Sequence, residues 1–161
     1  MKRKLALLLS ILMLLPAFSA CGGSASADVP VAELVTALSG TLSNADKLTD
    51  AGGDYVRGML ELDTDLFREY VLMLQTKGTE IDQYGIFRVR DIRDAESVAS
   101  KLEDYLLTMR NNWDALPYLP EERPKLDQAA VRTIGEYVVF TILSAEDTEA
   151  LNAQLDRMLK P

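Results

Sequence analysis

The sequence contains no histidine and only one cysteine, Cys21. The lack of imidazole excludes serine and cysteine catalytic triads and most zinc sites, because these depend on a histidine side chain. A single cysteine cannot form a disulfide within the chain, so there is no internal disulfide framework. The sequence also lacks a phosphate-binding glycine loop and the complete acidic loop that binds calcium. No cofactor or metal is therefore expected.

Long hydrophobic runs are scarce as well. The most apolar stretch, Leu5 to Leu15, is about 11 residues long, whereas a membrane-spanning helix needs roughly 20. It follows the basic residues Lys2, Arg3 and Lys4 and precedes Pro16 and several small residues. A basic start, a short apolar run and small residues together are typical of a bacterial secretory signal peptide.

The end of this leader indicates which kind of signal it is. Phe18-Ser19-Ala20-Cys21 resembles a lipobox, the site where lipoprotein signal peptidase cleaves before a lipid-modified cysteine. Small residues at positions 19 and 20 fit the motif, while Phe18 departs from it because leucine is usual there. The pattern predicts a signal peptide over residues 1–20 and lipid attachment at Cys21, with the protein anchored by acyl chains such as palmitate on the extracytoplasmic face of the cell membrane.

Two alternatives remain open at this point. Ordinary signal peptidase could cleave after Ala25-Ser26-Ala27, which is also an acceptable small-x-small site, and the product would then be secreted. Alternatively, the leader could stay in place as an uncleaved anchor.

Acidic side chains outnumber basic ones, 25 to 17. Removal of residues 1–20 takes away three basic and no acidic residues, which leaves 14 minus 25, or a net charge of −11. Such a domain is repelled by phosphate backbones and anionic headgroups, so nucleic acid is not an expected partner. Residues 21–27 are expected to form a flexible tether about 12–15 Å long, through which the domain reaches its membrane.

The remaining length, residues 28–161, suits a single domain. The segment from Glu80 to Arg90 alternates between apolar and polar positions, as expected of a strand. Two further strands, 129–134 and 137–143, flank Gly135-Glu136, a loop that suits a hairpin with Ile134 opposite Tyr137. Apolar residues at helical spacing follow each pair of strands, the first pair being 71–75 and 80–90 and the second 129–134 and 137–143. The order predicts an α+β fold with an antiparallel sheet built from two hairpins (a ββαββα core) and additional N-terminal helices.

The N-terminal part of the domain gives weaker signals. Val31, Leu34 and Leu38 form an apolar stripe of helical spacing, with Asp28 as the expected N-cap. A short helix is expected over residues 54–60. A second helical stretch is expected to end near Tyr70, followed by a strand over 71–75.

A family resemblance is carried by three segments and the lipobox. Tyr84-Gly85-Ile86-Phe87-Arg88-Val89, Tyr118-Leu119-Pro120-Glu121 and Gly135-Glu136-Tyr137-Val138-Val139 together resemble a family of bacterial (Clostridia-type) lipoproteins known as a domain of unknown function. The resemblance covers most of residues 60–160. It implies a location and an architecture, and it supplies no catalytic residues.

One group of side chains is a candidate binding face. The predicted strands place Tyr84, Arg88, Arg90, Arg132 and Tyr137 on the non-core side of the sheet. Arginine beside aromatic residues is a composition typical of binding surfaces. The alternative is that the N-terminal helices cover this face and that acidic residues pair with its arginines.

These observations favour a membrane-tethered binding or envelope-assembly module with an envelope protein as partner. One alternative is a carboxylate-dependent envelope enzyme, because paired carboxylates need neither histidine nor a nucleophile motif. Another is a secreted protein that binds a small ligand.

Overall fold

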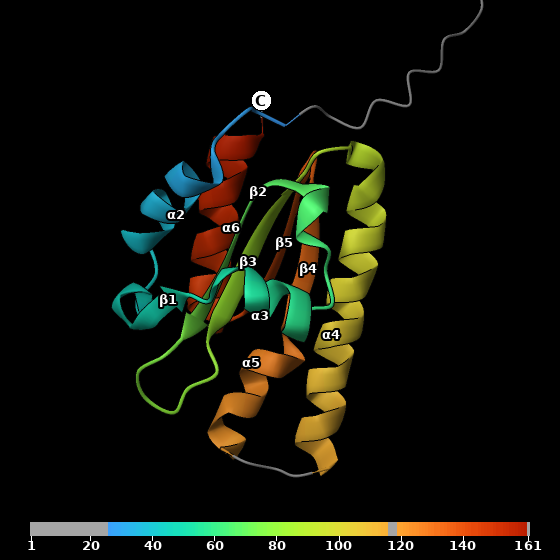
Figure 1. Ribbon diagram of the computed structural model, residues 1–161. Helices are drawn as coiled ribbons and strands as arrows, with labels where there is room; N and C mark the ends of the chain where they lie inside the picture. The colour runs from blue at the N-terminus through green and yellow to red at the C-terminus, as the bar shows by residue number, and fades with distance from the viewer. Residues whose placement is uncertain (1–25, 116–118, 161) are drawn as a thin grey trace, which may run out of the picture.

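Five strands pair in one antiparallel sheet, in the order β1-β2-β3-β5-β4. The computed structural model describes residues 26–115 and 119–160 (Figure 1). The strands are β1 (Leu48–Asp50), β2 (Phe67–Gln75), β3 (Gln83–Val89), β4 (Ala130–Ile134) and β5 (Tyr137–Ile142). The α+β class and the antiparallel sheet are confirmed.

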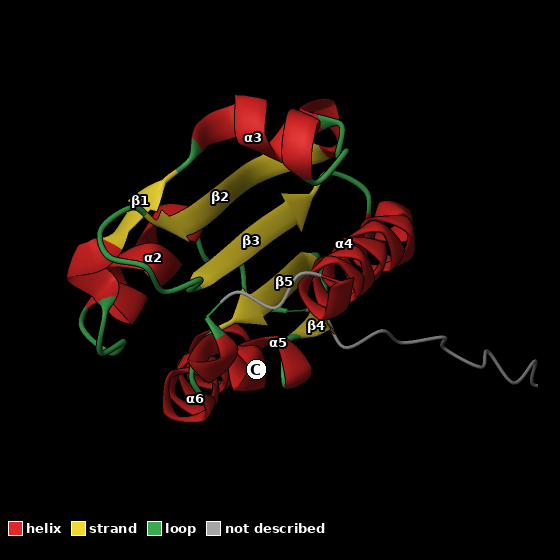
Figure 2. Ribbon diagram, turned by 90° about the horizontal axis from the view of Figure 1, so that it is seen from below, coloured by secondary structure: helices red, strands yellow, loops and turns green. Residues whose placement is uncertain are grey.

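Helices cover both faces of this sheet (Figure 2). The long helix α4 (Ala95–Ala115) packs on one face together with α3 (Gly52–Met59) and α5 (Arg123–Asp127). The other face is covered by α2 (Val31–Ser39) and α6 (Ala145–Leu159), which also contact each other. The result is three layers, with the sheet in the middle.

Each face of the sheet has its own hydrophobic core. Every residue of β3 is buried, so its alternating side chains enter two different cores. Phe87 and Val89 pack under α4, whereas Tyr84 and Ile86 pack under α2 and α6. The alternation seen in the sequence therefore separates two buried faces, not one buried face and one exposed face.

Gly85 lies in β3, close to the rings of Phe87 and Phe140. A Cβ added there would stand 2.6 Å from ring atoms of both Phe87 and Phe140. Only the absence of a side chain allows these two rings to approach the strand so closely.

The C-terminal hairpin has the expected register. Ile134 pairs with Tyr137, Arg132 with Val139, and Val131 with Phe140. This part is decided locally, because a two-residue loop with glycine at positive φ fixes which residues lie opposite one another.

The region around β2 differs from the prediction. The helical stretch expected near Tyr70 is only a 3-10 turn, Thr64–Leu66, and the strand begins at Phe67 instead of residue 71. Pairing with β3 over almost the whole of β2 overrides the weak local helical preference. The strand β1 and the helix α5 were not anticipated.

The start of the described chain is already bound to the domain. The Ala27 N–H donates to the Leu159 carbonyl at 2.9 Å, at the end of α6. Asp28 does not cap α2, whose N-cap is Pro30, and instead pairs with Arg88. Within the described residues, no helix has the length and apolar character needed to cross a membrane.

Candidate functional site

The face predicted to bind a partner lies beneath α2 and α6. Tyr84 is 2% exposed, Arg88 7% and Tyr137 0%. The expectation of an open face is therefore wrong for these three residues, and the covered arrangement considered beside it is the one that forms. The physical reason is that α2 and α6 present leucine and valine stripes that bury this side of the sheet.

Arg88 is held in a closed network. Its guanidinium donates to Asp28 at 2.6 Å and to Glu136 at 3.1 Å, and it lies 5.3 Å from the centre of the Tyr137 ring. Burial by itself would lower the pKa of Arg88, but the hydrogen bonds to Asp28 and Glu136 outweigh it and raise the pKa. This arginine fixes the N-terminal segment to the sheet.

The other two arginines of the predicted face are separated. Arg132 contacts Asn152 and Asp156 of α6. Arg90 is exposed beyond the end of β3, and its Nε donates to the Asp65 carbonyl at 3.1 Å. The five predicted residues thus do not form one surface.

The burial of Tyr84 leads to a prediction that can be tested by titration. Desolvation, reinforced by the negative charge of Asp50, raises the pKa of Tyr84 to about 12. Because the pKa of Tyr84 is higher in the folded protein than its ordinary value of 10.0, this tyrosine stabilises the folded state fully below pH 10.0. The contribution is lost as the pH rises from 10.0 through the folded-state pKa. Because burial also raises the pKa of Tyr105 and Tyr137, ultraviolet titration of phenolate formation is expected to show one late-ionising tyrosine fewer in Tyr84→Phe than in the wild type. Loss of a phenolate near pH 10 in the variant would contradict this assignment.

The predicted lipidation site lies outside the described residues. Cys21 and its flanking residues Phe18, Ser19 and Ala20 precede Ser26, where the description begins. Their roles stay predictions.

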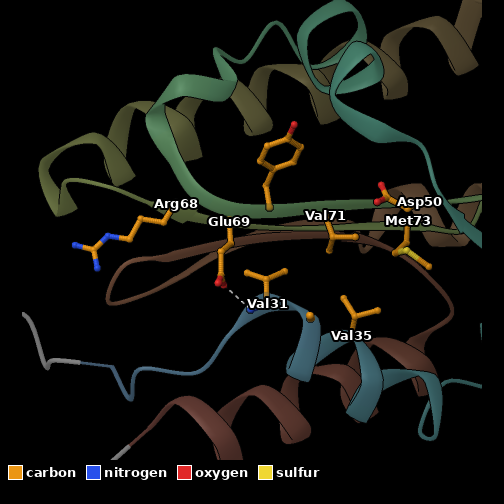
Figure 3. Close-up of a pocket in the computed structure, with 9 residues that line it drawn as sticks. Val31, Val35, Asp50, Arg68, Glu69, Val71 and Met73 are labelled. Atoms are coloured by element: carbon orange, nitrogen blue, oxygen red, sulfur yellow. Dashed lines mark hydrogen bonds between the residues drawn. The ribbon is translucent and has the colours of Figure 1, made fainter.

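A largely apolar groove opens on the surface between α2 and β2. Its volume is about 670 Å³. We call it the edge groove, because it runs along the outer edge of β2 (Figure 3). It is lined by Val31, Ala32, Val35, Asp50, Arg68, Glu69, Tyr70, Val71 and Met73.

The apolar part of the edge groove comes from two elements. Val31 and Val35 project from α2, and Val71 and Met73 project toward them from β2 (Figure 3). Alternate residues of a strand point to the same side, which is why 71 and 73 meet the helix together. The sequence offered a signal here, since apolar residues occupy both sides of Val71–Leu74 and so indicate a strand covered on both faces.

Two carboxylates of the groove serve the N-termini of helices. The Glu69 carboxylate accepts from the Val31 N–H at 2.7 Å, where α2 begins. The Asp50 carboxylate accepts from the Gly52 N–H at 2.9 Å, where α3 begins. Both carboxylates accept hydrogen bonds from backbone N–H groups that have no partner within their helices. Their main task in this structure is positioning of the groove walls.

The outer edge of β2 is only partly paired. β1 pairs with Met73, Leu74 and Gln75, and the last bond on that side runs from the Ala51 N–H to the Leu72 carbonyl at 2.8 Å. On the side of β2 that faces away from β3, no strand among the described residues pairs with the part of β2 that precedes Leu72. The edge groove therefore has backbone hydrogen-bonding groups along its floor.

A second polar cluster is buried elsewhere. Lys125 of α5 lies between Asp82 and Glu122, at 2.6 Å and 2.8 Å. Glu122 also accepts from the Ile81 N–H at 3.0 Å. The three charged groups satisfy one another, and their role is structural. In the described part of the chain, no group of three metal-ligating side chains lies close enough together to hold an ion.

Comparison with known proteins identifies the family. Residues 41–143 match the Domain of unknown function (DUF4358). The chain belongs to this family. No curated protein and no solved structure matches it.

The DUF4358 match confirms the resemblance to a domain of unknown function over a somewhat different range from the one expected. It includes all five strands and α3, α4 and α5, whereas α2 and α6 lie outside it. The edge groove is thus formed by the β1–β2 edge of the DUF4358 domain and by a helix that precedes the match.

Proposed function

We propose that this DUF4358 protein is a lipid-anchored, extracytoplasmic module that binds an envelope protein through the edge groove. The observation that carries the proposal is the groove itself, an open and largely apolar cavity with a volume of about 670 Å³ beside a partly unpaired strand. This volume is within the range of ligand-binding cavities, roughly 300–1,000 Å³. The two acidic residues that line it each hold a helix, which favours recognition over carboxylate chemistry.

The position of the N-terminus supports the anchoring part of the proposal. Ser26 is five residues after Cys21, and Ala27 is bonded to the end of α6. A Gly/Ser-rich chain of five residues spans about 12 Å on average. A lipid on Cys21 would therefore keep the end of the domain that carries Ser26 close to the bilayer, while the edge groove opens along β2.

The charge of the domain supports a protein partner. Residues 21–161 carry 14 basic and 25 acidic side chains. This negative domain is repelled by anionic headgroups and attracted to basic protein surfaces.

The anchor is tested by Cys21→Ala. We expect the variant to lose incorporation of a labelled palmitate analogue and to leave the membrane fraction, because no other thiol is present to accept the lipid. Labelling followed by fractionation of the cells that produce the protein would measure both effects. Unchanged membrane retention together with an unchanged intact mass would contradict lipidation.

The binding role is tested by photocrosslinking in the anchored protein. A photoreactive amino acid at Val35, inside the groove, is expected to give a discrete crosslinked product on the native membrane. The matched control is the same group at Thr36, the exposed neighbour on α2. Equal crosslinking from both positions, or none from either, would reject the edge groove as the contact surface.

A further inference from the structure

We infer that the occupant of the edge groove is an extended polypeptide segment that adds to the sheet beside β2, in line with β1. This rests on the proposed binding function and specifies its partner chemically. The segment would run antiparallel to β2, carry apolar side chains at alternate positions, and have a net positive charge.

The backbone of β2 identifies the occupant as an extended chain. The Leu72 carbonyl faces the β1 side, because it accepts from the Ala51 N–H there. In an antiparallel strand this orientation repeats every second residue, so the N–H and C=O of Tyr70 face the same side. β1 ends at Asp50, opposite Met73, and the chain then leaves the sheet toward α3. The backbone groups of Tyr70 therefore lack a strand partner within the described residues, and another extended backbone is the chemical group that fits both of them.

The side chains around this edge define what the segment carries. A residue opposite Val71 would point to the same side as Val71, into the apolar space that Val35 and Met73 also line. A residue opposite Tyr70 would point the other way, toward α3, where Gly53 lies so close to Tyr70 that an added Cβ would be 2.6 Å from its hydroxyl oxygen. That side has little room, so an apolar residue fits opposite Val71 and a small one opposite Tyr70.

Charge and local geometry set the length and the sign of the segment. A bulge between Phe67 and Glu69 leaves Arg68 half-exposed at one end of the open edge. Bulges and charged residues interrupt strand pairing, so the added strand would stop there. The net charge of −11, from 14 basic and 25 acidic residues after position 20, favours basic residues in the partner.

The inference is tested with the full-length mature protein in detergent micelles and a displayed library of random linear peptides. In the tightest peptide selected, N-methylation is expected to weaken binding by about tenfold at the one residue that lies opposite Tyr70 and to have little effect at the residues on either side of it, because their N–H groups face away from β2. In the protein, exchange of the Tyr70 amide is expected to slow on peptide binding, while that of Val71, which faces β3, stays unchanged.

Two variants locate the binding. Val35→Glu places a charge in the apolar space and is expected to lower the affinity for the peptide by about tenfold. Thr36→Glu adds the same charge on the exposed side of α2 and is expected to leave the affinity unchanged. Circular dichroism and thermal melting verify that both variants fold, so a loss of binding in Val35→Glu alone supports the groove.

Other results would overturn the inference. N-methylation effects spaced three or four residues apart would mean that a helix binds, and failure to select any peptide that depends on Val35 would mean that no extended segment does. A dimer in solution that slows exchange of the Tyr70 amide would assign the edge to a second copy of the chain. If Val35 crosslinks on the membrane but no single N-methylated position weakens peptide binding, the proposed binding function stands and this inference alone fails.

Discussion

Replacement of Lys125 by methionine is expected to lower the free energy of unfolding by about 3 kcal/mol. The substitution keeps the apolar stem but removes the ammonium group that lies between Asp82 and Glu122. Those carboxylates are 3% and 9% exposed, so without Lys125 two negative charges remain buried together. Urea denaturation of the wild type and the variant measures the difference.

The matched control is Lys47→Met. Lys47 pairs with Glu80 at 3.2 Å, but both side chains are more than a third exposed. Exposed ion pairs contribute about 0–1 kcal/mol, so this variant is expected to unfold almost like the wild type. Similar losses in the two variants would show that burial of the Lys125 cluster does not matter.

The same cluster predicts a dependence on alkaline pH. Burial by itself would lower the pKa of Lys125, but the hydrogen bonds to Asp82 and Glu122 outweigh it and raise the pKa above its ordinary value of 10.5. A raised pKa contributes stability that is complete below 10.5 and is lost as the pH rises through the folded-state value. The difference between wild type and Lys125→Met is therefore expected to shrink in that alkaline range.

Truncation of Phe87 to alanine is expected to cost about 3–5 kcal/mol. Phe87 is fully buried in β3, with its ring centre 5.2 Å from that of Phe67 and 6.4 Å from that of Phe140. Its removal leaves a cavity between two rings that are fixed on neighbouring strands, and the sheet cannot close around it without losing pairing. Chemical denaturation measures the loss.

Ile92→Ala serves as the control for this truncation. Ile92 is 51% exposed, just after β3. Its truncation removes little buried surface and is expected to change stability by less than about 0.5 kcal/mol. A Phe87→Ala variant as stable as Ile92→Ala would mean that the aromatic contacts under α4 contribute little.

The candidate site shows where sequence reasoning reached its limit. The alternation in β3 correctly separates Phe87 and Val89 from Tyr84 and Arg88. The arginines on one side of the sheet suggested that this face is exposed to solvent. Arg88 is nevertheless buried, because Asp28 and Glu136 pair with it. Those partners are 60 and 48 positions away along the chain, and no local pattern reveals such pairings.

The apolar residues of Val71–Leu74 indicated a strand covered on both faces, but the opening of the edge groove beside it could not be predicted, for a similar reason. The groove forms because β1 ends at Asp50 whereas β2 extends back to Phe67, which among the described residues leaves the first part of β2 without a strand on its outer side. It also requires α2 to lie beside this part of β2. A strand of three residues, Leu48–Asp50, carries no recognisable pattern, and its pairing with β2 is a long-range contact.

Some properties of this protein are determined by the sequence alone. The absence of histidine, the acidic balance and the register of the β4–β5 hairpin follow from composition or from neighbouring residues, and so does the prediction of lipidation at Cys21. The tertiary structure decided the strand order, the burial of Arg88 and Tyr137, and the opening of the β2 edge beside α2. The physical reason is range: turns and helix faces depend on residues a few positions apart, whereas pairing of strands and coverage of a sheet face depend on the free energy of burying distant segments together.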